Sequence, residues 1–364
     1  MKNRTQVDYV IVGAGVVGGA VAARLCEKYP EKVVILLEAG PRPAEGVTSR
    51  NSGVIHAGIY YPPRSFKAET CVRGKLLLYE WVLKHNVPHR RCGKFIVATT
   101  KSAISNLEAL YSNGKESGVD DLKLVGPSDV IHREPYLKCE AAIWSPSTGI
   151  VDPAQLTRSF LSYAIQNGLV FMPNHSVVRI FALSPHNFEI VAGEEEIKTP
   201  VIINCAGLYA DRVAKMAGVD KYKIFPCRGD YFSMKTKMSF NSLIYPVKDP
   251  DSPGLGVHLT IDLAGKYRLG PDTEYVESRD SFLPREDKIG IFKAAAKKLL
   301  GEEIEFELTY DTCGIRPKLR APTESVEKDF VISEDLPGLI NTVGIESPGL
   351  TASLAIAERI VFGV

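Results

Sequence analysis

The hydrophobic residues near the start of the chain fall into short apolar runs on either side of one helical segment. Residues 9–12 are an apolar, β-branched run, residues 20–25 have helical spacing, and residues 33–37 form a second apolar run that ends before Glu38. Short apolar runs separated by a helix are typical of buried parallel strands. The pattern therefore predicts a strand–helix–strand unit at the start of the chain.

Later segments alternate between helical and strand-like patterns. Helical periodicity recurs in three of them: residues 68–85, 103–117 and 284–300. Strand-like patterns dominate three others: residues 93–100, 222–275 and 305–317. A further helix is expected to begin near Pro153 with Asp152 as its N-cap, and the chain closes with a strand, a glycine loop and a helix over 339–363. Because no repeat or linker divides these 364 residues, we predict two domains that the chain crosses several times.

Three glycines follow the first apolar run in the spacing G-x-G-x-x-G. Gly13 permits a tight turn, Gly15 lets the backbone approach a pyrophosphate, and Gly18 lets the helix and strand pack closely. The helix N-terminus offers unpaired N–H groups and a positive dipole to phosphates. Glu38, at the end of the second strand, can accept hydrogen bonds from ribose hydroxyls. This context predicts a dinucleotide site. The carboxylate disfavours the 2′-phosphate of NADP and leaves NAD and FAD open.

Composition excludes several other classes of function. The net charge is +1, so no electrostatic argument favours nucleic acid as a partner. The seven cysteines are scattered singly with no C-x-x-C pair, which disfavours a metal site or a disulfide framework and favours a reducing compartment. No apolar run reaches the roughly 18 residues of a membrane span, and the early strand leaves no room for a signal peptide. We expect a cytoplasmic or mitochondrial protein that is not secreted.

One loop combines polar side chains with apolar ones that suggest burial. Residues 49–63, SRNSGVIHAGIYYPP, hold His56 and the pair Tyr60–Tyr61 among glycines and aliphatic residues. A histidine and two tyrosines are not needed to make such a loop soluble. The composition of this loop therefore indicates a functional site.

Several segments together resemble the FAD-dependent oxidoreductases of the D-amino-acid oxidase and glycerol-3-phosphate dehydrogenase superfamily. VIINCAGLYADRVA (201–214) is similar to the second flavin motif of that superfamily, CGIRPKLRAPTESVEKDFVI (313–332) to its G-x-R-P segment, and VGIESPGLTASLAIAERI (343–360) to its closing loop and helix. Within the superfamily, NSGVIHAGIYY, SFKAETCVRGKLLLYEW, FPCRGDYF and GLGVHLTIDLAGKYRLGPD look most like segments of the L-2-hydroxyglutarate dehydrogenases. The resemblance spans nearly the whole chain.

The resemblance implies an α/β fold with two interleaved domains. A Rossmann-type FAD-binding domain is expected to comprise residues 1–85, 150–220 and 311–364. A substrate domain with a mixed or antiparallel sheet is expected to comprise residues 86–149 and 221–310.

The resemblance also assigns FAD contacts to the glycine motif, to the loop before His56 and to later segments. The loop would run from the pyrophosphate to the isoalloxazine, where polar side chains donate hydrogen bonds and glycines let the backbone approach the flat ring. The closing helix would point its N-terminus at the N1–C2=O edge of the flavin. The residues expected to bind FAD are Gly13, Gly15, Val16, Val17, Gly18, Glu38, Ala39, Ser49, Arg50, Asn51, Ser52, Gly53, Val178, Ala206, Gly207, Gly344, Gly349, Leu350 and Thr351.

Oxidation of a small 2-hydroxy acid, most closely L-2-hydroxyglutarate by this resemblance, moves a hydride from Cα to flavin N5 while a base takes the hydroxyl proton. A histidine titrates near neutral pH and suits the role of base. His56 is the first candidate and His258 the second, and the sequence does not decide between them. Arg316 would hold the substrate carboxylate with its planar fork.

Four further residues are candidates for the substrate pocket: Tyr60, Tyr61, Lys67 and Arg228. A dicarboxylate needs a second cationic contact, which Arg228 or Lys67 can provide. Electrons are expected to pass to a quinone or another electron-transfer carrier, because only one nucleotide fingerprint is present. A glycerol-3-phosphate dehydrogenase, an amino-acid oxidase or dehydrogenase and a non-catalytic flavin-binding or tRNA-modifying module stay open as alternatives, although the near-neutral charge weighs against RNA. The lysine-bearing helix 284–300 leaves a peripheral membrane contact open.

Overall fold

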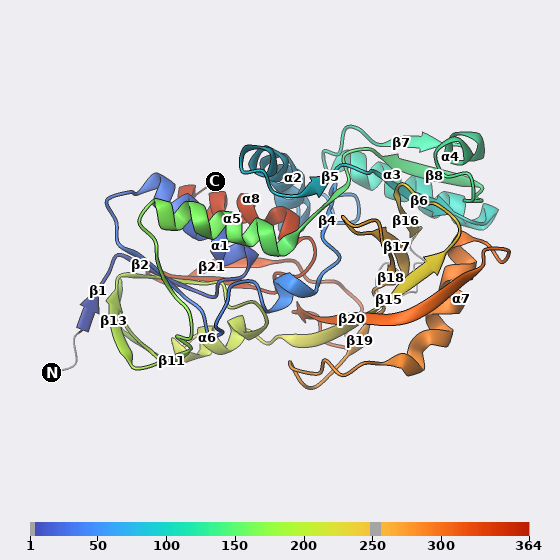
Figure 1. The fold of residues 1–364 in the computed structure, drawn as a ribbon. Coiled ribbons are helices and arrows are strands. Elements are labelled where there is room, and N and C mark those ends of the chain that lie inside the picture. Colours follow the sequence, from blue (N-terminus) through green and yellow to red (C-terminus); the bar gives the residue numbers. More distant parts are fainter. Residues whose placement is uncertain (1–3, 248–255, 364) are drawn as a thin grey trace.

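The computed structural model describes residues 4–247 and 256–363 and has two halves, each built around its own large sheet (Figure 1). The half on the left of Figure 1 contains both the first strands and the closing helix α8 (Gly349–Phe362), so opposite ends of the chain meet there. The half on the right is built from the middle of the chain. The predicted α/β fold class, with more than one mixed sheet, is confirmed.

The first half is organised around a six-stranded sheet in the order β10-β3-β2-β14-β22-β21. Its strands are β10 (Val170–Met172), β3 (Val34–Leu37), β2 (Tyr9–Val12), β14 (Val201–Asn204), β22 (Leu339–Val343) and β21 (Val331–Leu336). Five of them run parallel, and β21 is antiparallel to β22. The inner strands are mostly apolar because both faces of the sheet are covered, and the buried Asn204 of β14 pairs with Asn341 of β22.

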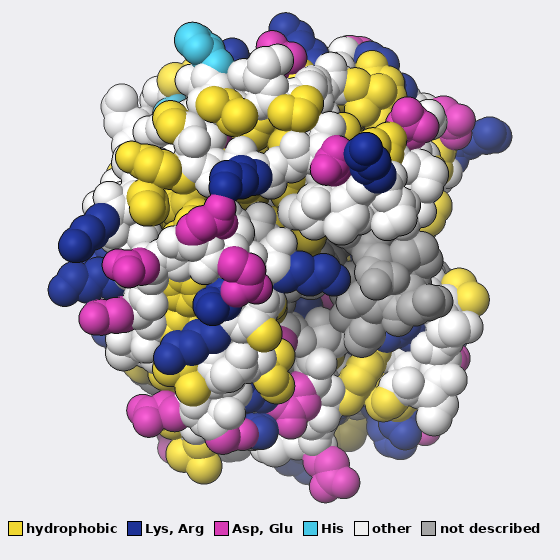
Figure 2. Space-filling view, turned by 90° about the vertical axis from the view of Figure 1, so that its right-hand side faces the viewer, with side chains coloured by type: hydrophobic (Ala, Val, Ile, Leu, Met, Phe, Trp, Pro, Cys, Tyr) yellow, Lys and Arg dark blue, Asp and Glu magenta, His cyan; other side chains and the backbone are white. Residues whose placement is uncertain are grey.

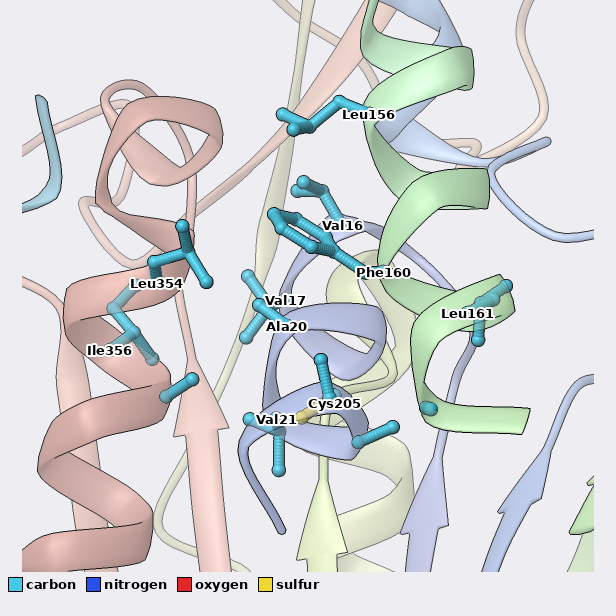
Figure 3. Close-up of a cluster of buried hydrophobic side chains, with 14 of the residues drawn as sticks. Val16, Val17, Ala20, Val21, Leu156, Phe160, Leu161, Cys205, Leu354 and Ile356 are labelled. Atoms are coloured by element: carbon cyan, nitrogen blue, oxygen red, sulfur yellow. The ribbon is translucent and has the colours of Figure 1, made fainter. Parts of the chain in front are cut away.

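Three helices pack together on one face of this sheet. They are α1 (Val16–Lys28), α5 (Pro153–Gln166) and α8. In Figure 3, Val17 and Ala20 of α1 lie between Phe160 of α5 and Leu354 of α8, all within one buried hydrophobic cluster. The helix α5 begins as predicted, because the Asp152 carboxylate accepts hydrogen bonds of 2.9 Å from two backbone N–H groups of the first turn.

A smaller sheet covers the other face. Its order is β1-β13-β12-β11, with β1 (Arg4–Gln6), β13 (Glu195–Thr199), β12 (Asn187–Ala192) and β11 (Val177–Ser184). The short helix α6 (Ala210–Met216) follows β14. Its residues Val213 and Ala214 belong to a second buried cluster, together with apolar residues of this smaller sheet. The central sheet is therefore buried between a helical layer and a second sheet.

The second half is a nine-stranded, mostly antiparallel sheet. Its order is β19-β15-β18-β17-β16-β6-β8-β7, and β20 pairs with β15 beside this path. The strands are β19 (Glu274–Tyr275), β15 (Phe225–Thr236), β18 (Tyr267–Gly270), β17 (His258–Ile261), β16 (Leu243–Pro246), β6 (Lys94–Ala98), β8 (Ala141–Ser145), β7 (Lys123–Val125) and β20 (Phe306–Lys318). The long pair β15–β20 reaches from this sheet towards the first half (Figure 1).

Three helices surround the second sheet: α3 (Ile104–Glu116), α4 (Pro127–Arg133) and α7 (Ile289–Leu300). Figure 2 looks onto this side of the molecule and shows acidic and basic side chains intermingled rather than gathered by sign. Among residues 4–247 and 256–363, no helix combines the length and the apolar character of a membrane span. The domain boundaries stay a prediction.

The loop 49–63 and the helix α2 (Phe66–Lys84) lie at the junction of the halves. The loop contributes β4 (Val54–Ile55) to a small sheet with β9 (Gly149–Val151) and β5 (His89–Arg90). The helix α2 approaches α8 so closely that a Cβ at Gly74 would lie 2.4 Å from the Thr351 carbonyl oxygen. The loop itself contacts both the closing helix, through a hydrogen bond of His56 with Thr351, and the hydrophobic cluster of the second sheet, which includes Val54 and Ile59.

Candidate active site

A cavity of about 1050 Å³ is lined by residues of both halves. One part of its wall is the glycine motif and the segment after β14, and another part is formed by strands of the second sheet. Most of the residues predicted for the site line it: Gly13, Gly15, Val16, Val17, Glu38, Ala39, Arg50, Asn51, Ser52, His56, Tyr60, Tyr61, Lys67, Ala206, Gly207, His258, Arg316, Gly349 and Leu350. The fold therefore brings the nucleotide motif and the candidate catalytic residues to one cavity.

The glycine motif forms a tight turn against the start of α1. Gly13 has a φ of 102°, and a Cβ there would lie 2.6 Å from the carbonyl oxygen of Cys205. The backbone N–H of Val16 donates a 3.0 Å hydrogen bond to Oγ1 of Thr48, which sequence reasoning did not single out. Gly15, the N-cap residue of α1, has no side chain that could accept a hydrogen bond from the first turn. This cradle of backbone beside a helix N-terminus fits the pyrophosphate of a dinucleotide.

Glu38 is fixed at the end of β3 by the backbone around it. Its two carboxylate oxygens accept hydrogen bonds from the N–H groups of Ala14 (2.8 Å) and Gly40 (2.9 Å). The carboxylate lines the cavity beside the glycine motif. A carboxylate in this position can accept hydrogen bonds from the hydroxyls of an adenosine ribose.

Gly18 does not line the cavity and instead brings α1 onto the turn. A Cβ at this position would lie 1.9 Å from the carbonyl oxygen of Gly13. We expect Gly18→Ala to lower the free energy of unfolding by about 3 kcal/mol, because the helix would have to move away from the strand. Urea denaturation of the two proteins measures this difference.

A matched control for that substitution lies in α7. A Cβ at Gly290 would meet no atom within 4 Å, so Gly290→Ala should leave stability unchanged or raise it slightly through better helix propensity. Equal urea midpoints for Gly18→Ala and the parent protein would contradict the packing role of Gly18.

Six residues predicted to bind FAD do not line the cavity: Gly18, Ser49, Gly53, Val178, Gly344 and Thr351. Val178 is 50% exposed, and the preceding Val177 lines the cavity instead, because successive side chains of a strand point to opposite faces. Thr351 does not reach the cavity, but it contacts the loop that lines it. Its Oγ1 accepts a 3.0 Å hydrogen bond from the backbone N–H of His56 and lies 3.3 Å from the Val54 carbonyl oxygen, so α8 holds the loop 49–63 in place.

His56 presents an unpaired ring nitrogen. Its Nε2 lies 3.3 Å from Oγ of Ser347, while Nδ1 is buried and has no hydrogen-bond partner among the described residues. Burial, together with the nearby charges of Lys94 and His258, lowers the pKa of His56 to about 3. The imidazole is therefore neutral at pH 7 and keeps a lone pair for a proton.

His258 lies on β17 with its ring stacked on Tyr245, with 3.7 Å between the ring centroids. Its Nδ1 lies 2.9 Å from the Gly256 carbonyl oxygen, which can only accept a hydrogen bond. This contact assigns the proton to Nδ1 and leaves the lone pair on Nε2. Burial lowers the pKa of His258 to about 3, against the opposing effect of this backbone bond. Both candidate bases thus line the cavity as neutral imidazoles.

Arg316 lines the cavity without a carboxylate partner among the described residues. Its Nε and Nη2 donate hydrogen bonds to neutral acceptors, namely the carbonyl oxygens of Cys227, Arg228 and Asp272 and the hydroxyl of Thr273. These contacts fix the guanidinium without pairing it directly with a carboxylate of the described residues. A fixed arginine of this kind is suited to bind a carboxylate ligand.

Arg228 is not at the cavity, and its predicted contact with the substrate is corrected here. The residue is 2% exposed, and its guanidinium forms hydrogen bonds with both carboxylate oxygens of Asp230. Nζ of Lys288 lies 2.7 Å from the same carboxylate. The charge of Arg228 is therefore paired inside the second half and is not available to a ligand.

Lys67 lines the cavity as predicted, but its charge is also paired. Its Nζ lies 3.1 Å from Oε1 of Glu346 and donates a hydrogen bond to the Lys328 carbonyl oxygen. Lys318 contacts the same Glu346 oxygen at 3.3 Å and Glu327 at 3.0 Å. Neither predicted source of a second cationic contact is free.

Sequence reasoning missed several residues around the cavity: Thr48, Lys94, Tyr231, Tyr245, Lys318 and Glu346. Lys94 had one signal in the sequence, since a lysine opens the apolar run of β6. Thr48 lies in a short 3-10 helix (Val47–Arg50) and Glu346 in a loop, and no sequence pattern distinguishes either residue.

Comparison with known proteins finds a matching family and relatives that align over nearly the whole chain. The DAO family model, described as FAD dependent oxidoreductase, matches residues 8–362. The mitochondrial L-2-hydroxyglutarate dehydrogenase of Arabidopsis thaliana is 36% identical over 411 aligned positions, covering 98% of this chain and 83% of the relative. The L-2-hydroxyglutarate dehydrogenase of Indibacter alkaliphilus is 31% identical over 389 positions, covering 96% of this chain and 97% of the relative.

Solved structures of flavoenzymes share the fold. The dithionite-reduced L-α-glycerophosphate oxidase from Mycoplasma pneumoniae with FAD bound has a TM-score of 0.86 at 25% identity, covering 98% of this chain and 95% of that chain. The glycine oxidase from Geobacillus kaustophilus has a TM-score of 0.80 at 16% identity, covering 98% of this chain and 94% of that chain, and is a likeness of fold alone.

Proposed function

This chain belongs to the DAO family of FAD-dependent oxidoreductases, and we propose that it oxidises L-2-hydroxyglutarate to 2-oxoglutarate. The family match confirms the predicted cofactor, FAD. Relatives that align over nearly the whole chain carry the name L-2-hydroxyglutarate dehydrogenase. The observation that carries the proposal is Arg316, a fixed guanidinium without a carboxylate partner among the described residues, in a cavity that two neutral histidines also line.

The residues of the first half fit FAD. The cradle around Gly13, the N-terminus of α1 and the Glu38 carboxylate would hold the pyrophosphate and the adenosine ribose. When bound, FAD supplies the acceptor for the hydride that leaves Cα of the substrate. The protein's own residues supply orientation and proton transfer.

We propose that Arg316 binds the 1-carboxylate of the substrate through two parallel hydrogen bonds. A bidentate pair fixes both the position and the rotation of the carboxylate, and so fixes the direction of the Cα–H bond. His56 or His258 then takes the proton of the 2-hydroxyl group. Because both imidazoles are neutral at pH 7, either can accept a proton without first losing one.

Glycerol 3-phosphate is the second candidate substrate, because the structure with the highest similarity reported above is an L-α-glycerophosphate oxidase. A phosphate dianion favours several uncompensated cations. Lys67 and Lys318 share the Glu346 carboxylate, and Lys318 also contacts Glu327, so the charges of both lysines are largely paired. This balance favours a carboxylate over a phosphate.

We propose that the electrons pass to a quinone or another electron-transfer carrier and that the protein works in a reducing compartment, the cytoplasm or the mitochondrion. All seven cysteines are free thiols, and several relatives carry the word mitochondrial in their names. A peripheral membrane contact through α7 stays a proposal. It is supported only by the 64% exposed Ile291 beside the lysines of that helix.

The test is reduction of the FAD-loaded protein under anaerobic conditions. L-2-hydroxyglutarate, D-2-hydroxyglutarate, glycerol 3-phosphate and L-amino acids are added in separate cuvettes while the visible flavin absorbance is recorded. We expect rapid bleaching by L-2-hydroxyglutarate alone, because Arg316 fixes one face of Cα towards the acceptor. Bleaching by another compound, and not by this one, would overturn the proposed substrate.

A further inference from the structure

The side chain of Lys94 is among the most buried charged groups of the protein. Lys94 opens β6, between β16 and β8 in the second sheet, and is 1% exposed. Among the described residues, its Nζ forms no hydrogen bond and no ion pair with a carboxylate. A buried ammonium without a partner is costly, and in folded proteins such a group is normally paired or hydrogen-bonded.

Lys94 does not itself line the cavity, but the two tyrosine rings over which its Nζ lies do. Its Nζ lies 4.8 Å from the ring centroid of Tyr60 and 4.6 Å from that of Tyr245, and these two rings are stacked 6.5 Å apart. Both tyrosines line the cavity, as do His56 and His258, on which the Lys94 charge acts. The ammonium is therefore held beside the part of the cavity where the candidate bases lie.

A second polar group in this region also lacks a partner. The hydroxyl oxygen of Tyr60 is buried and has no hydrogen-bond partner among the described residues. Together with Nδ1 of His56, this makes two unsatisfied polar atoms on residues that line the cavity, and Nζ of Lys94 lies over the ring of one of these residues, Tyr60. Unsatisfied buried donors mark a place where a polar ligand is missing.

Several other cations that line the cavity are paired or already assigned, and Arg212 lines it from α6 in the first half. Lys67 and Lys318 share Glu346, and Arg279 forms two hydrogen bonds with Asp211. Arg316 has been assigned to the 1-carboxylate. Its charge and that of Lys94 both act on His258, so this histidine lies within electrostatic reach of both groups.

We propose that Lys94, with the hydroxyl of Tyr60, binds the distal carboxylate of the substrate, so that the enzyme selects 2-hydroxy dicarboxylic acids over 2-hydroxy monocarboxylic acids. The inference rests on the proposed function, and it replaces Arg228 and Lys67 as the source of the second cationic contact. A site built to hydrogen-bond a polar group rejects the analogue that lacks this group, because its own buried donors are then left unpaired.

The test compares two substrates of equal chain length in the FAD-loaded enzyme. L-2-hydroxyglutarate carries a carboxylate where L-2-hydroxypentanoate carries a methyl group. We expect Lys94→Met to lower kcat/KM for L-2-hydroxyglutarate about 100-fold and to change the value for L-2-hydroxypentanoate less than about threefold. We expect Tyr60→Phe, which removes one oxygen atom, to lower only the value for the dicarboxylate, by about tenfold.

Lys75 provides the matched control. Like Lys94 it is a buried lysine that does not itself line the cavity, at 7% exposure, but its Nζ donates a 2.9 Å hydrogen bond to Oγ of Ser147, which does not line the cavity either. Lys75→Met should leave the ratio of the two kcat/KM values unchanged. An unchanged ratio in Lys94→Met, or an equal fall for both substrates, would overturn the role of Lys94 in specificity.

Binding of unreactive acids tests the same contact without turnover. We expect glutarate to bind the wild-type holoenzyme about 100-fold more tightly than pentanoate, as measured by titration of the flavin spectrum, and Lys94→Met to remove this difference. If L-2-hydroxyglutarate fails to bleach the flavin, the proposed function fails, and the comparison of glutarate with pentanoate still decides the role of Lys94. Equal affinities in the wild-type protein would overturn it.

The pH dependence of glutarate binding adds an independent readout. Burial lowers the pKa of Lys94 to about 7, and a bound carboxylate raises it again. Above about pH 7 binding must therefore take up a proton, so glutarate affinity should fall as the pH rises, and should not do so in Lys94→Met. The groups that face Lys94 are His56, His258, Tyr60, Tyr245 and Cys71. Burial keeps both histidines neutral and the other three protonated from about pH 6 to 9.

Discussion

Replacement of Arg316 by leucine is expected to lower kcat/KM for L-2-hydroxyglutarate by about 1000-fold. Removal of one partner of a buried, hydrogen-bonded charge pair costs about 2–5 kcal/mol. The loss also frees the Cα–H bond to point away from its acceptor, which adds to the cost in the transition state. Stopped-flow measurement of flavin reduction over a range of substrate concentrations gives both the affinity and the limiting rate.

Arg316→Lys separates charge from geometry. A lysine keeps the positive charge but cannot form two parallel hydrogen bonds with one carboxylate, so we expect an intermediate loss of about 100-fold in kcat/KM. Arg316 also donates hydrogen bonds to backbone carbonyl groups of β15, so the FAD content and the urea midpoint of each variant serve as controls. A kcat/KM for Arg316→Leu within tenfold of the wild-type value would refute the assignment of the 1-carboxylate to Arg316.

The nucleotide site could be predicted from the sequence because its determinants are local. The turn at Gly13, the packing at Gly18 and the carboxylate at Glu38 each follow from positions near one another in one strand–helix–strand unit. The fingerprint fixes these positions because each has a single steric or hydrogen-bonding task. Thr48 escaped prediction because its contact with the start of α1 crosses 32 positions of chain.

The error over Arg228 was avoidable, because its partner stands two positions along the same strand. Residues i and i+2 of a strand share a face, so Arg228 and Asp230 of β15 were placed to form a pair before any tertiary contact was known. Lys94 could not be interpreted in this way. Its isolation depends on the pairing of β6 with β16, which brings Tyr245 from another part of the chain to the lysine.

Replacement of His56 by asparagine is expected to lower the limiting rate of flavin reduction by about 1000-fold, the usual contribution of a general base. Asparagine keeps a polar side chain of similar size, so the backbone contact with Thr351 is retained. We expect His258→Asn to lower the rate only about tenfold. Each imidazole keeps a lone pair, on Nε2 in His258, while Nδ1 of His56 is buried without a hydrogen-bond partner among the described residues, so the two variants must be compared. The reverse order of the two effects would assign the base to His258.

The pH dependence follows from the state of the two imidazoles. An exposed histidine would be half protonated near its usual pKa of about 6.5, and activity would fall as the pH drops through that value. Here burial places the pKa of both histidines at about 3, so the base stays neutral and kcat/KM should be flat from about pH 8 down to about pH 5. L-2-hydroxypentanoate is the substrate for this measurement, because it has no distal carboxylate to bring in the titration of Lys94. In Lys94→Met the acid limb should move to higher pH, since the Lys94 charge is one cause of the low pKa of His56. A limb near pH 6.5 in the wild-type enzyme would mean that the catalytic base is neither of these buried histidines.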